Sequence, residues 1–279
     1  MGVCRPLKTH FKWAHIKLMI ICVLLVLACL VFHRKTSAVD EKSPTESSKL
    51  NQTKLNAFIL TDDCASHKYN KTKTNIEVAF PNLFSFSCVP PVPFTDPRIH
   101  ILPLHQPKLD SSNVLTFIDL WTYKIAENLK TDEYQWSFIF EDDISFVDAS
   151  FISLPNYNTP LQELMTNREV QEKHGFFYLG LCRATFDNDN YSLTFNRTGH
   201  QLHSRKGCGF CRHATAITTK RAELLWSEIS SYRSDVDGTI DILLHNYCVR
   251  SGNHFYTFGA NFQNSSNGEQ IGIAYNNRA

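Results

Sequence analysis

Short apolar runs alternate with amphipathic stretches over most of the chain beyond residue 56. The runs at 57–60 (AFIL), 138–140 (FIF) and 176–179 (FFYL) are rich in aromatic and β-branched residues, which predicts strands buried on both faces. Between the first two runs, apolar residues recur at three- and four-residue spacing over about 113–130, which predicts a helix. Because strand and helix patterns alternate, we predict an α/β layered fold.

Weaker patterns predict the other elements. Ser111 or Ser112 is the expected cap of the helix at 113–130. The polar stretch 183–206 is expected to form a loop. We expect further helices at about 159–173, 220–230 and 237–249, and further strands at about 75–80, 214–218 and 253–258.

An unbroken apolar run of 15 residues, 18–32, lies near the N-terminus. At ~1.5 Å per residue this run covers about 22 Å, a little less than a bilayer core. Residues 1–17 contain four basic and no acidic side chains, which favours a cytosolic location for this tail. We therefore expect a transmembrane signal anchor at 18–33, a polar stem at 34–55 and a lumenal domain at 56–279.

The apolar run also allows a second interpretation, a cleaved signal peptide that is processed near Thr36-Ser37-Ala38. As an anchor, the short run fits the thinner membranes of the early secretory pathway. The expected location is therefore the membrane of the Golgi apparatus or endoplasmic reticulum, as a single-pass type II protein.

Glycosylation motifs and cysteines agree with a lumenal domain. Six cysteines fall within 56–279, and an even number in an oxidising compartment suggests disulfides, whose pairing the sequence leaves open. Cys208-Gly-Phe-Cys211 could instead be a redox motif or half of a zinc site, but structural disulfides are the leading interpretation. Asn-x-Ser/Thr acceptors occur at Asn51, Asn70, Asn190, Asn196 and Asn264.

The charge distribution argues against one class of partner. The chain of 279 residues has a formal net charge of only +1, and part of its positive charge lies in the N-terminal tail. Because the rest is close to neutral, it offers no broad basic surface for nucleic acid. We therefore expect no nucleic-acid partner.

Three carboxylates, Glu141, Asp142 and Asp143, directly follow the apolar run 138–140. Strand side chains alternate, so we expect Glu141 and Asp143 to point one way and Asp142 the other. Paired carboxylates at the end of a buried strand suit Mg²⁺ or Mn²⁺, and ligands of open α/β sheets lie beyond the carboxyl ends of strands. The alternative is that these acids begin a solvated turn. The metal hypothesis requires that Glu141 and Asp143 face a cavity and are not neutralised by Lys or Arg.

Four segments, taken in order, resemble glycosyltransferase family 25, the family of lipooligosaccharide and procollagen galactosyltransferases. The run AFIL resembles the family's opening strand, and SFIFEDDISF at 137–146, after a helix ending in IAENL, resembles its EDD motif. FFYLG at 176–180 resembles a further strand of the family. HATAITTKRAELLW at 213–226, followed by GTIDILL at 238–244, resembles its small-residue strand, helix and acidic segment.

The resemblance implies a GT-A-like (Rossmann-like) mixed sheet with flanking helices, and a UDP-sugar donor, with UDP-galactose the leading candidate. The metal ion, Mn²⁺ or Mg²⁺, would be held by Glu141 and Asp143, and His254 would complete its site. Asp142 would bind the metal or the donor's ribose, and Asp62 would contact the nucleotide. Asp241 would accept a proton from the acceptor hydroxyl, which belongs to a glycan or glycoprotein.

Two positions differ from the family pattern. The segment after the first strand carries Lys68, Lys71 and Lys73 where the family has Arg, and Phe117-Ile118 stands where the family's Ser-His pair is expected. A catalytically inactive member that binds glycan or protein, for example in adhesion, is therefore an alternative to the enzyme. A calcium-binding ectodomain that uses the acids structurally is a third hypothesis.

Overall fold

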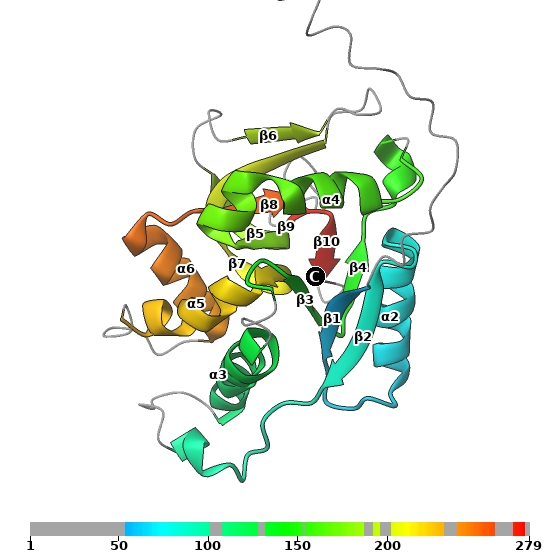
Figure 1. The fold of residues 1–279 in the computed structure, drawn as a ribbon. Coiled ribbons are helices and arrows are strands. Elements are labelled where there is room, and N and C mark those ends of the chain that lie inside the picture. Colours follow the sequence, from blue (N-terminus) through cyan, green and yellow to red (C-terminus); the bar gives the residue numbers. More distant parts are fainter. Residues whose placement is uncertain are drawn as a thin grey trace, which may run out of the picture. The chain divides into compact units, whose positions relative to one another are not determined.

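Three parallel strands form one half of the main sheet (Figure 1). In the computed structural model, β1 (Leu55–Leu60) pairs with β2 (Phe84–Val89) on one side and with β3 (Trp136–Glu141) on the other. Because β1 has a parallel neighbour on each side, the order β2-β1-β3 creates a topological switch point between β1 and β3. The structure describes residues 54–100, 108–127, 132–152, 154–186, 192–195, 202–231, 239–259 and 270–276.

The other half of the sheet is largely antiparallel. β7 (Leu202–Thr218) pairs with β3, and the strand order continues through β8 (Phe255–Phe258) and β5 (Phe176–Phe186) to β9 (Gln270–Gly272). β6 (Ser192–Phe195) pairs with the first part of β7. Among the described residues the main sheet thus has eight strands of mixed direction. A separate two-stranded sheet joins β4 (Ile144–Phe146) to β10 (Ala274–Asn276).

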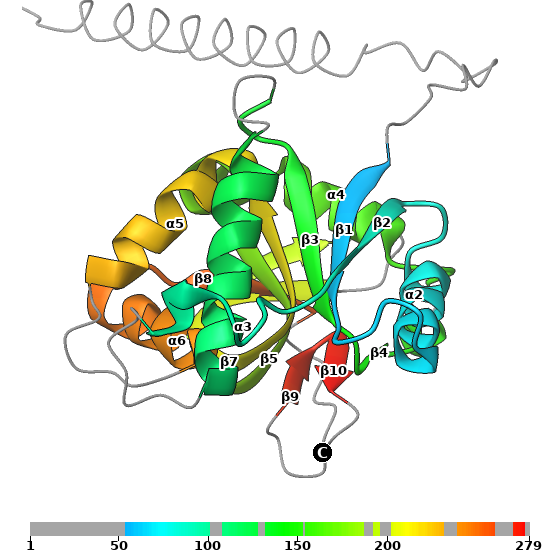
Figure 2. The ribbon, with the colours of Figure 1, turned by 90° about the horizontal axis from the view of Figure 1, so that it is seen from below.

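Helices cover both faces of the main sheet (Figures 1 and 2). On one face lie α3 (Lys108–Asp119), η2 (Leu120–Ile125), α5 (Thr219–Ser231) and α6 (Ile240–Ser251). On the other face lie α2 (His67–Ala79) and α4 (Asn158–Thr166). The short elements are η1 (Pro97–His100), η4 (Ala149–Ile152) and η5 (Glu169–His174). This arrangement confirms the predicted α/β class with a mixed sheet.

Strand alternation divides the apolar side chains into two cores. Phe138 and Phe140 of β3 pack into the core that α2 and α4 cover, whereas Ile139 between them packs into the core that α3, α5 and α6 cover. All three side chains are at most 1% exposed. The prediction that the run 138–140 is a strand buried on both faces is therefore confirmed.

Residues 75–80 were expected to form a strand but mostly belong to α2. Lys68, Thr72 and Asn75 recur at helical spacing and hydrogen-bond to Asp142, in the turn after β3, or to Ile144, the first residue of β4. This face of the helix therefore makes polar contacts, which hides the apolar periodicity that would have identified a helix.

Two further expectations were wrong. The stretch 183–206 is not a single loop, because β5 continues to Phe186 and β7 begins at Leu202, with β6 between them. Backbone pairing in such a ribbon needs no alternation of apolar residues. Ser111 and Ser112 lie inside α3 rather than at its cap, and the Ser112 hydroxyl donates to the Val92 carbonyl.

The predicted N-terminal segments lie outside the described residues. These are the tail at 1–17, the anchor at 18–33 and nearly all of the stem at 34–55, since β1 already begins at Leu55. Within the part of the chain that the structure describes, none of the helices combines the length and apolar character that crossing a membrane requires.

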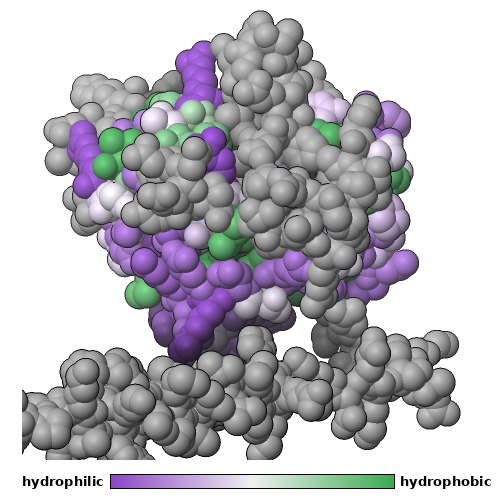
Figure 3. Space-filling view, turned by 90° about the horizontal axis from the view of Figure 1, so that it is seen from above, coloured by the Kyte–Doolittle hydropathy of each residue, from purple (hydrophilic) through white to green (hydrophobic). Residues whose placement is uncertain are grey.

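Hydrophilic residues dominate the coloured part of the face shown in Figure 3, where hydrophobic residues form small separate groups. The large hydrophobic side chains that are exposed among the described residues lie on different elements, at Val78, Phe94, Tyr123, Leu224 and Val249. Isolated exposed apolar residues of this kind are ordinary in water-facing surfaces.

Candidate functional site

A cavity of about 320 Å³ lies at the carboxyl ends of β1, β2 and β3. Leu60 of β1 is paired with Val89 of β2 and with Glu141 of β3, so the ends of the three strands meet there. Its lining comprises Leu60, Thr61, Asp62, Lys68, Val89, Pro91, Asp110, Asn113, Thr116, Glu141, Asp142, Thr239 and Asp241. The cavity therefore lies at the switch point of the sheet, where open α/β sheets bind their ligands.

The loop after β1 is fixed by local contacts. The Asp63 carboxylate accepts a hydrogen bond from the Ala65 backbone N–H at 2.8 Å, and the Ser66 hydroxyl caps α2 by accepting from Tyr69 N–H. A disulfide joins Cys64 in this loop to Cys88 at the end of β2. Asp62 precedes Cys64 in the sequence and Lys68 follows it. The contacts of this loop therefore hold both residues at the cavity.

Asp142 is held by three side chains. Its Oδ2 accepts a hydrogen bond from the Thr61 hydroxyl at 2.6 Å, and its Oδ1 lies 2.5 Å from Lys68 Nζ. Its backbone carbonyl accepts from the Thr72 hydroxyl at 2.7 Å. Both carboxylate oxygens of Asp142 are therefore engaged, one of them by a cation.

Glu141 and Asp143 do not line the cavity together. β3 ends at Glu141 and β4 begins at Ile144, so Asp142 and Asp143 form a two-residue turn and strand alternation stops at Glu141. Glu141 and Asp142 both line the cavity, whereas Asp143, which is buried, is not among the described lining residues. Two adjacent carboxylates thus face the cavity, but they are 141 and 142 rather than 141 and 143, so the condition set for a metal site held by Glu141 and Asp143 is not met.

Two helices complete the walls. Asp110, Asn113 and Thr116 recur every three residues on α3 and all line the cavity. Thr239, the N-cap residue of α6, and Asp241 in its first turn line it from another side. Of the predicted site residues, the fold therefore brings together Asp62, Glu141, Asp142 and Asp241, and sequence reasoning missed Lys68, Asp110, Asn113, Thr116 and Thr239. The three-residue spacing of polar side chains on α3 was the signal that could have predicted three of these five.

The described lining of the cavity is strongly acidic. It contains one basic residue, Lys68, and five carboxylates, at Asp62, Asp110, Glu141, Asp142 and Asp241. Like charges at short range repel, and a low-dielectric wall strengthens the repulsion, so the cavity favours cations. Its donor atoms are oxygens, the ligands that Mg²⁺, Mn²⁺ and Ca²⁺ prefer.

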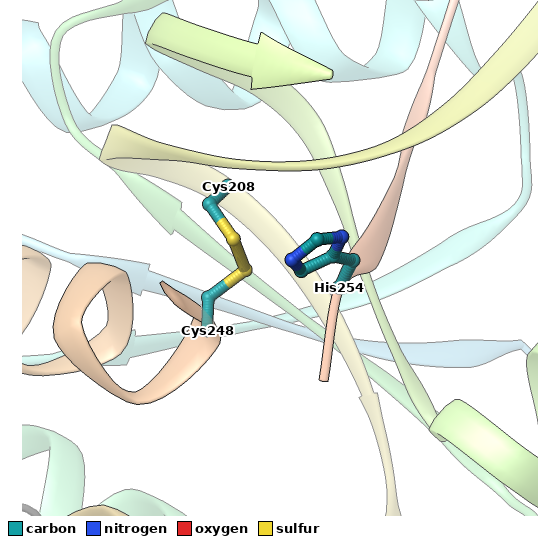
Figure 4. Close-up of side chains that lie close together, drawn as sticks. All are labelled: Cys208, Cys248 and His254. Carbon is teal, nitrogen blue, oxygen red and sulfur yellow. A yellow bond between two sulfur atoms is a disulfide. The ribbon is translucent and has the colours of Figure 1, made fainter. Parts of the chain in front are cut away.

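His254 lies elsewhere, beside the disulfide between Cys208 and Cys248 (Figure 4). Its ring nitrogen and the two sulfurs lie within 4.8 Å of one another. While the sulfurs are bonded to each other, neither is a thiolate that could bind a metal. Because Cys208 pairs with Cys248 in α6, it does not form a redox pair with Cys211, and the interpretation as a structural disulfide is confirmed for this cysteine.

Comparison with known proteins assigns no family to the chain. Its sequence matches no protein-family model, and no curated protein matches it. The argument about function therefore depends on the fold, the cavity and the residues that line it.

Proposed function

We propose that this protein is a lumenal, metal-dependent glycosyltransferase with a GT-A-like fold. It would transfer a hexose, with galactose the leading candidate, from a UDP-sugar to a glycan or glycoprotein acceptor. The observation that carries the proposal is the acidic cavity at the β1/β3 switch point, lined by Asp62, Glu141, Asp142 and Asp241. Nucleotides bind at this place in open α/β sheets, and carboxylates there can hold the cation that a diphosphate requires.

The residues present fit a hard divalent cation. Glu141 and Asp62 offer carboxylate oxygens from the ends of β3 and β1, and Asp142 offers a third carboxylate. Bound Mn²⁺ or Mg²⁺ would neutralise the charge that develops on the departing diphosphate. Since Asp143 and His254 are not among the described lining residues, we do not include them in the proposed metal site.

The remaining groups have distinct proposed tasks. Asp241, in the first turn of α6, would accept the proton of the acceptor hydroxyl as it attacks the sugar. Asn113 and Thr116 of α3 offer amide and hydroxyl groups suited to hydrogen bonding with a sugar or ribose.

The proposed compartment is supported by the covalent chemistry of the domain. Two disulfides are described, Cys64–Cys88 and Cys208–Cys248, and Cys182 is disulfide-bonded as well. Disulfides persist in the secretory pathway and are rare in the cytosol. We propose that the apolar segment 18–33 anchors the protein in a Golgi or endoplasmic reticulum membrane.

A nucleotide-sugar panel tests the enzyme. The full-length protein in detergent is incubated with Mn²⁺ and each donor, and release of the nucleoside diphosphate is measured with and without acceptor glycans. Glu141→Gln should lower donor turnover by about 100-fold or more, because it removes a charge that acts on the transition state. Glu223→Gln, an exposed change on α5, is the matched control and should leave turnover unchanged. Turnover that survives in Glu141→Gln would refute the assigned role.

The ion pair between Lys68 and Asp142 favours a second candidate, a protein that binds glycan or a partner protein without transfer. A carboxylate that is already neutralised has less need of a metal ion. In that case the folded protein would bind glycans on an array but would bind no UDP-sugar in the presence of Mn²⁺. The enzyme, in contrast, must bind the UDP-sugar as well as its acceptor.

A further inference from the structure

We propose that Lys68 is an exchangeable counter-ion of the cavity, which competes with a divalent cation for Asp142 and, once displaced, binds a phosphate of the nucleotide. The proposal rests on the proposed function and specifies how its metal and nucleotide sites are coupled. Lys68 then becomes a positioning residue for the diphosphate.

The contacts of Asp142 single out Lys68 as the partner that can move. Thr61 and Thr72, which donate to Asp142, are buried at 6% and 2% exposure. The Lys68 side chain is 47% exposed and reaches Asp142 through a flexible four-carbon chain. A cation that binds Asp142 Oδ1 can therefore displace Lys68 without unpacking the core, while both threonines stay in place.

The charge of the cavity gives the displaced lysine a destination. Lys68 is the basic residue among the described lining residues, which also include five carboxylates. Without a positive charge near the phosphates, this lining would repel a diphosphate. Once the divalent cation has replaced Lys68 at Asp142, the ammonium group is available to an anion in the same cavity.

The position of Lys68 on its helix points the same way. It is the second residue of α2, whose first turn contains no acidic residue. A cation at a helix N-terminus is unfavourable because it meets the positive end of the helix dipole, so the helix itself does not account for a lysine at this position. Backbone N–H groups at such a helix end favour an anion, and Lys68 adds its charge to theirs.

The proposal predicts opposite effects of one substitution on two ligands. Lys68→Gln removes the competitor and should tighten the binding of Mn²⁺ alone by about 3- to 10-fold. The same change should weaken the binding of UDP at saturating Mn²⁺ by about 10-fold, the effect expected from one charge-assisted hydrogen bond. A lysine that only stabilises the fold would not move the two affinities in opposite directions.

The experiment uses the full-length protein in detergent. Mn²⁺ binding is measured from the electron paramagnetic resonance signal of unbound Mn²⁺, and UDP binding by calorimetry at saturating Mn²⁺. Lys71→Gln, an exposed change three residues further along α2, is the control for charge and should leave both affinities unchanged. Lys68→Arg keeps the charge and should stay within a few-fold of the wild type in Mn²⁺ binding. Thermal unfolding of each variant checks that it is folded.

Opposite shifts in Lys68→Gln, absent from Lys71→Gln, support the proposal. The wild type could bind both ligands while Lys68→Gln weakens both affinities or changes neither. That result would refute the exchange of Lys68 for a metal ion at Asp142 but not the proposed enzyme. If the wild type binds neither Mn²⁺ nor UDP, the proposed function fails and the exchange fails with it.

Discussion

Cys208 of β7 is disulfide-bonded to Cys248 of α6, the helix whose first turn carries Asp241. Thr239, the N-cap residue of the same helix, also lines the cavity. One covalent bond therefore ties the helix that forms one wall of the candidate site to the longest strand of the main sheet. The disulfide lies away from the cavity but restrains the element that carries Asp241.

Removing this disulfide should destabilise the domain. The two cysteines are 40 residues apart in sequence, and closing a loop of that length reduces the entropy of the unfolded chain by an equivalent of about 4 kcal/mol. The double variant Cys208→Ser/Cys248→Ser should therefore unfold at a clearly lower temperature, as measured by near-ultraviolet circular dichroism. Reductant should lower the unfolding temperature of the wild type more than that of the double variant. Equal decreases in the two proteins would contradict the prediction.

Thr72→Val should destabilise the turn that presents Asp142. Thr72 is 2% exposed, and its hydroxyl donates a hydrogen bond to the Asp142 carbonyl. In Thr72→Val this carbonyl loses its donor, and water cannot easily replace the donor at a buried position. The expected loss is about 1–3 kcal/mol in the free energy of unfolding, measured by denaturant titration.

Three variants serve as controls for that change. Thr72→Ser keeps the hydroxyl and should cost less than Thr72→Val. Asn70→Gln removes the same glycosylation motif without touching Thr72, so it separates the loss of a glycan from the loss of the hydrogen bond. Thr74→Val alters an exposed hydroxyl on the same helix. If it lowers the free energy of unfolding as much as Thr72→Val does, the hydrogen-bond explanation is contradicted.

His174 should make the domain less stable in mild acid. Burial, together with the positive charge of Lys206, lowers the pKa of His174 from 6.5 to about 4. Well above pH 6.5 the imidazole is neutral in both the folded and the unfolded chain. As the pH falls from 6.5 to 4, the unfolded chain takes up a proton that the folded chain does not, so the free energy of unfolding decreases, by up to about 3 kcal/mol.

The groups around His174 define how this is tested. Glu169 Oε1 lies 3.6 Å from His174 Nε2 but is already paired with Lys206 Nζ at 2.5 Å. The charge of Lys173 also lowers the pKa of His174, and the Tyr256 ring lies edge-on to the imidazole. Lys206 lowers the pKa of Glu169 below its usual 4.5, so this carboxylate affects stability mainly at lower pH. His174→Gln should flatten the pH dependence of stability between pH 5 and 6.5, and the exposed His67→Gln should not.

Phe138→Ala should cost about 3–5 kcal/mol in the free energy of unfolding, because it opens a cavity in the core between β3 and its neighbours. The Phe138 ring is fully buried, and its centroid lies 4.8 Å from that of Phe84 and 6.0 Å from that of Phe177. Phe94→Ala, which removes a ring that is 53% exposed, is the matched control and should cost far less. Chemical denaturation of both variants measures the difference.

The sequence by itself determined the buried strands at 57–60, 138–140, 176–179, 214–218 and 253–258 and most of the helices that pack on the sheet. Buried strands such as 138–140 and the apolar face of α3 leave patterns that depend only on neighbouring residues, because each residue's burial follows from the period of its element. The sequence also located the acidic end of β3. It gave no sign that 75–80 is helical or that 202–206 belongs to a strand, since polar contacts and backbone pairing with distant segments decide both.

Only the tertiary structure decided which side chains share the cavity. Asp62, Glu141 and Asp241 come from segments that are far apart in sequence, and the fold brings the ends of three parallel strands together with the first turn of α6. The turn at 142–143 ended the alternation on which the pairing of Glu141 with Asp143 depended, and the fold placed His254 beside a disulfide instead. Periodicity describes a side chain relative to its own element, whereas a binding site depends on where separate elements end in space.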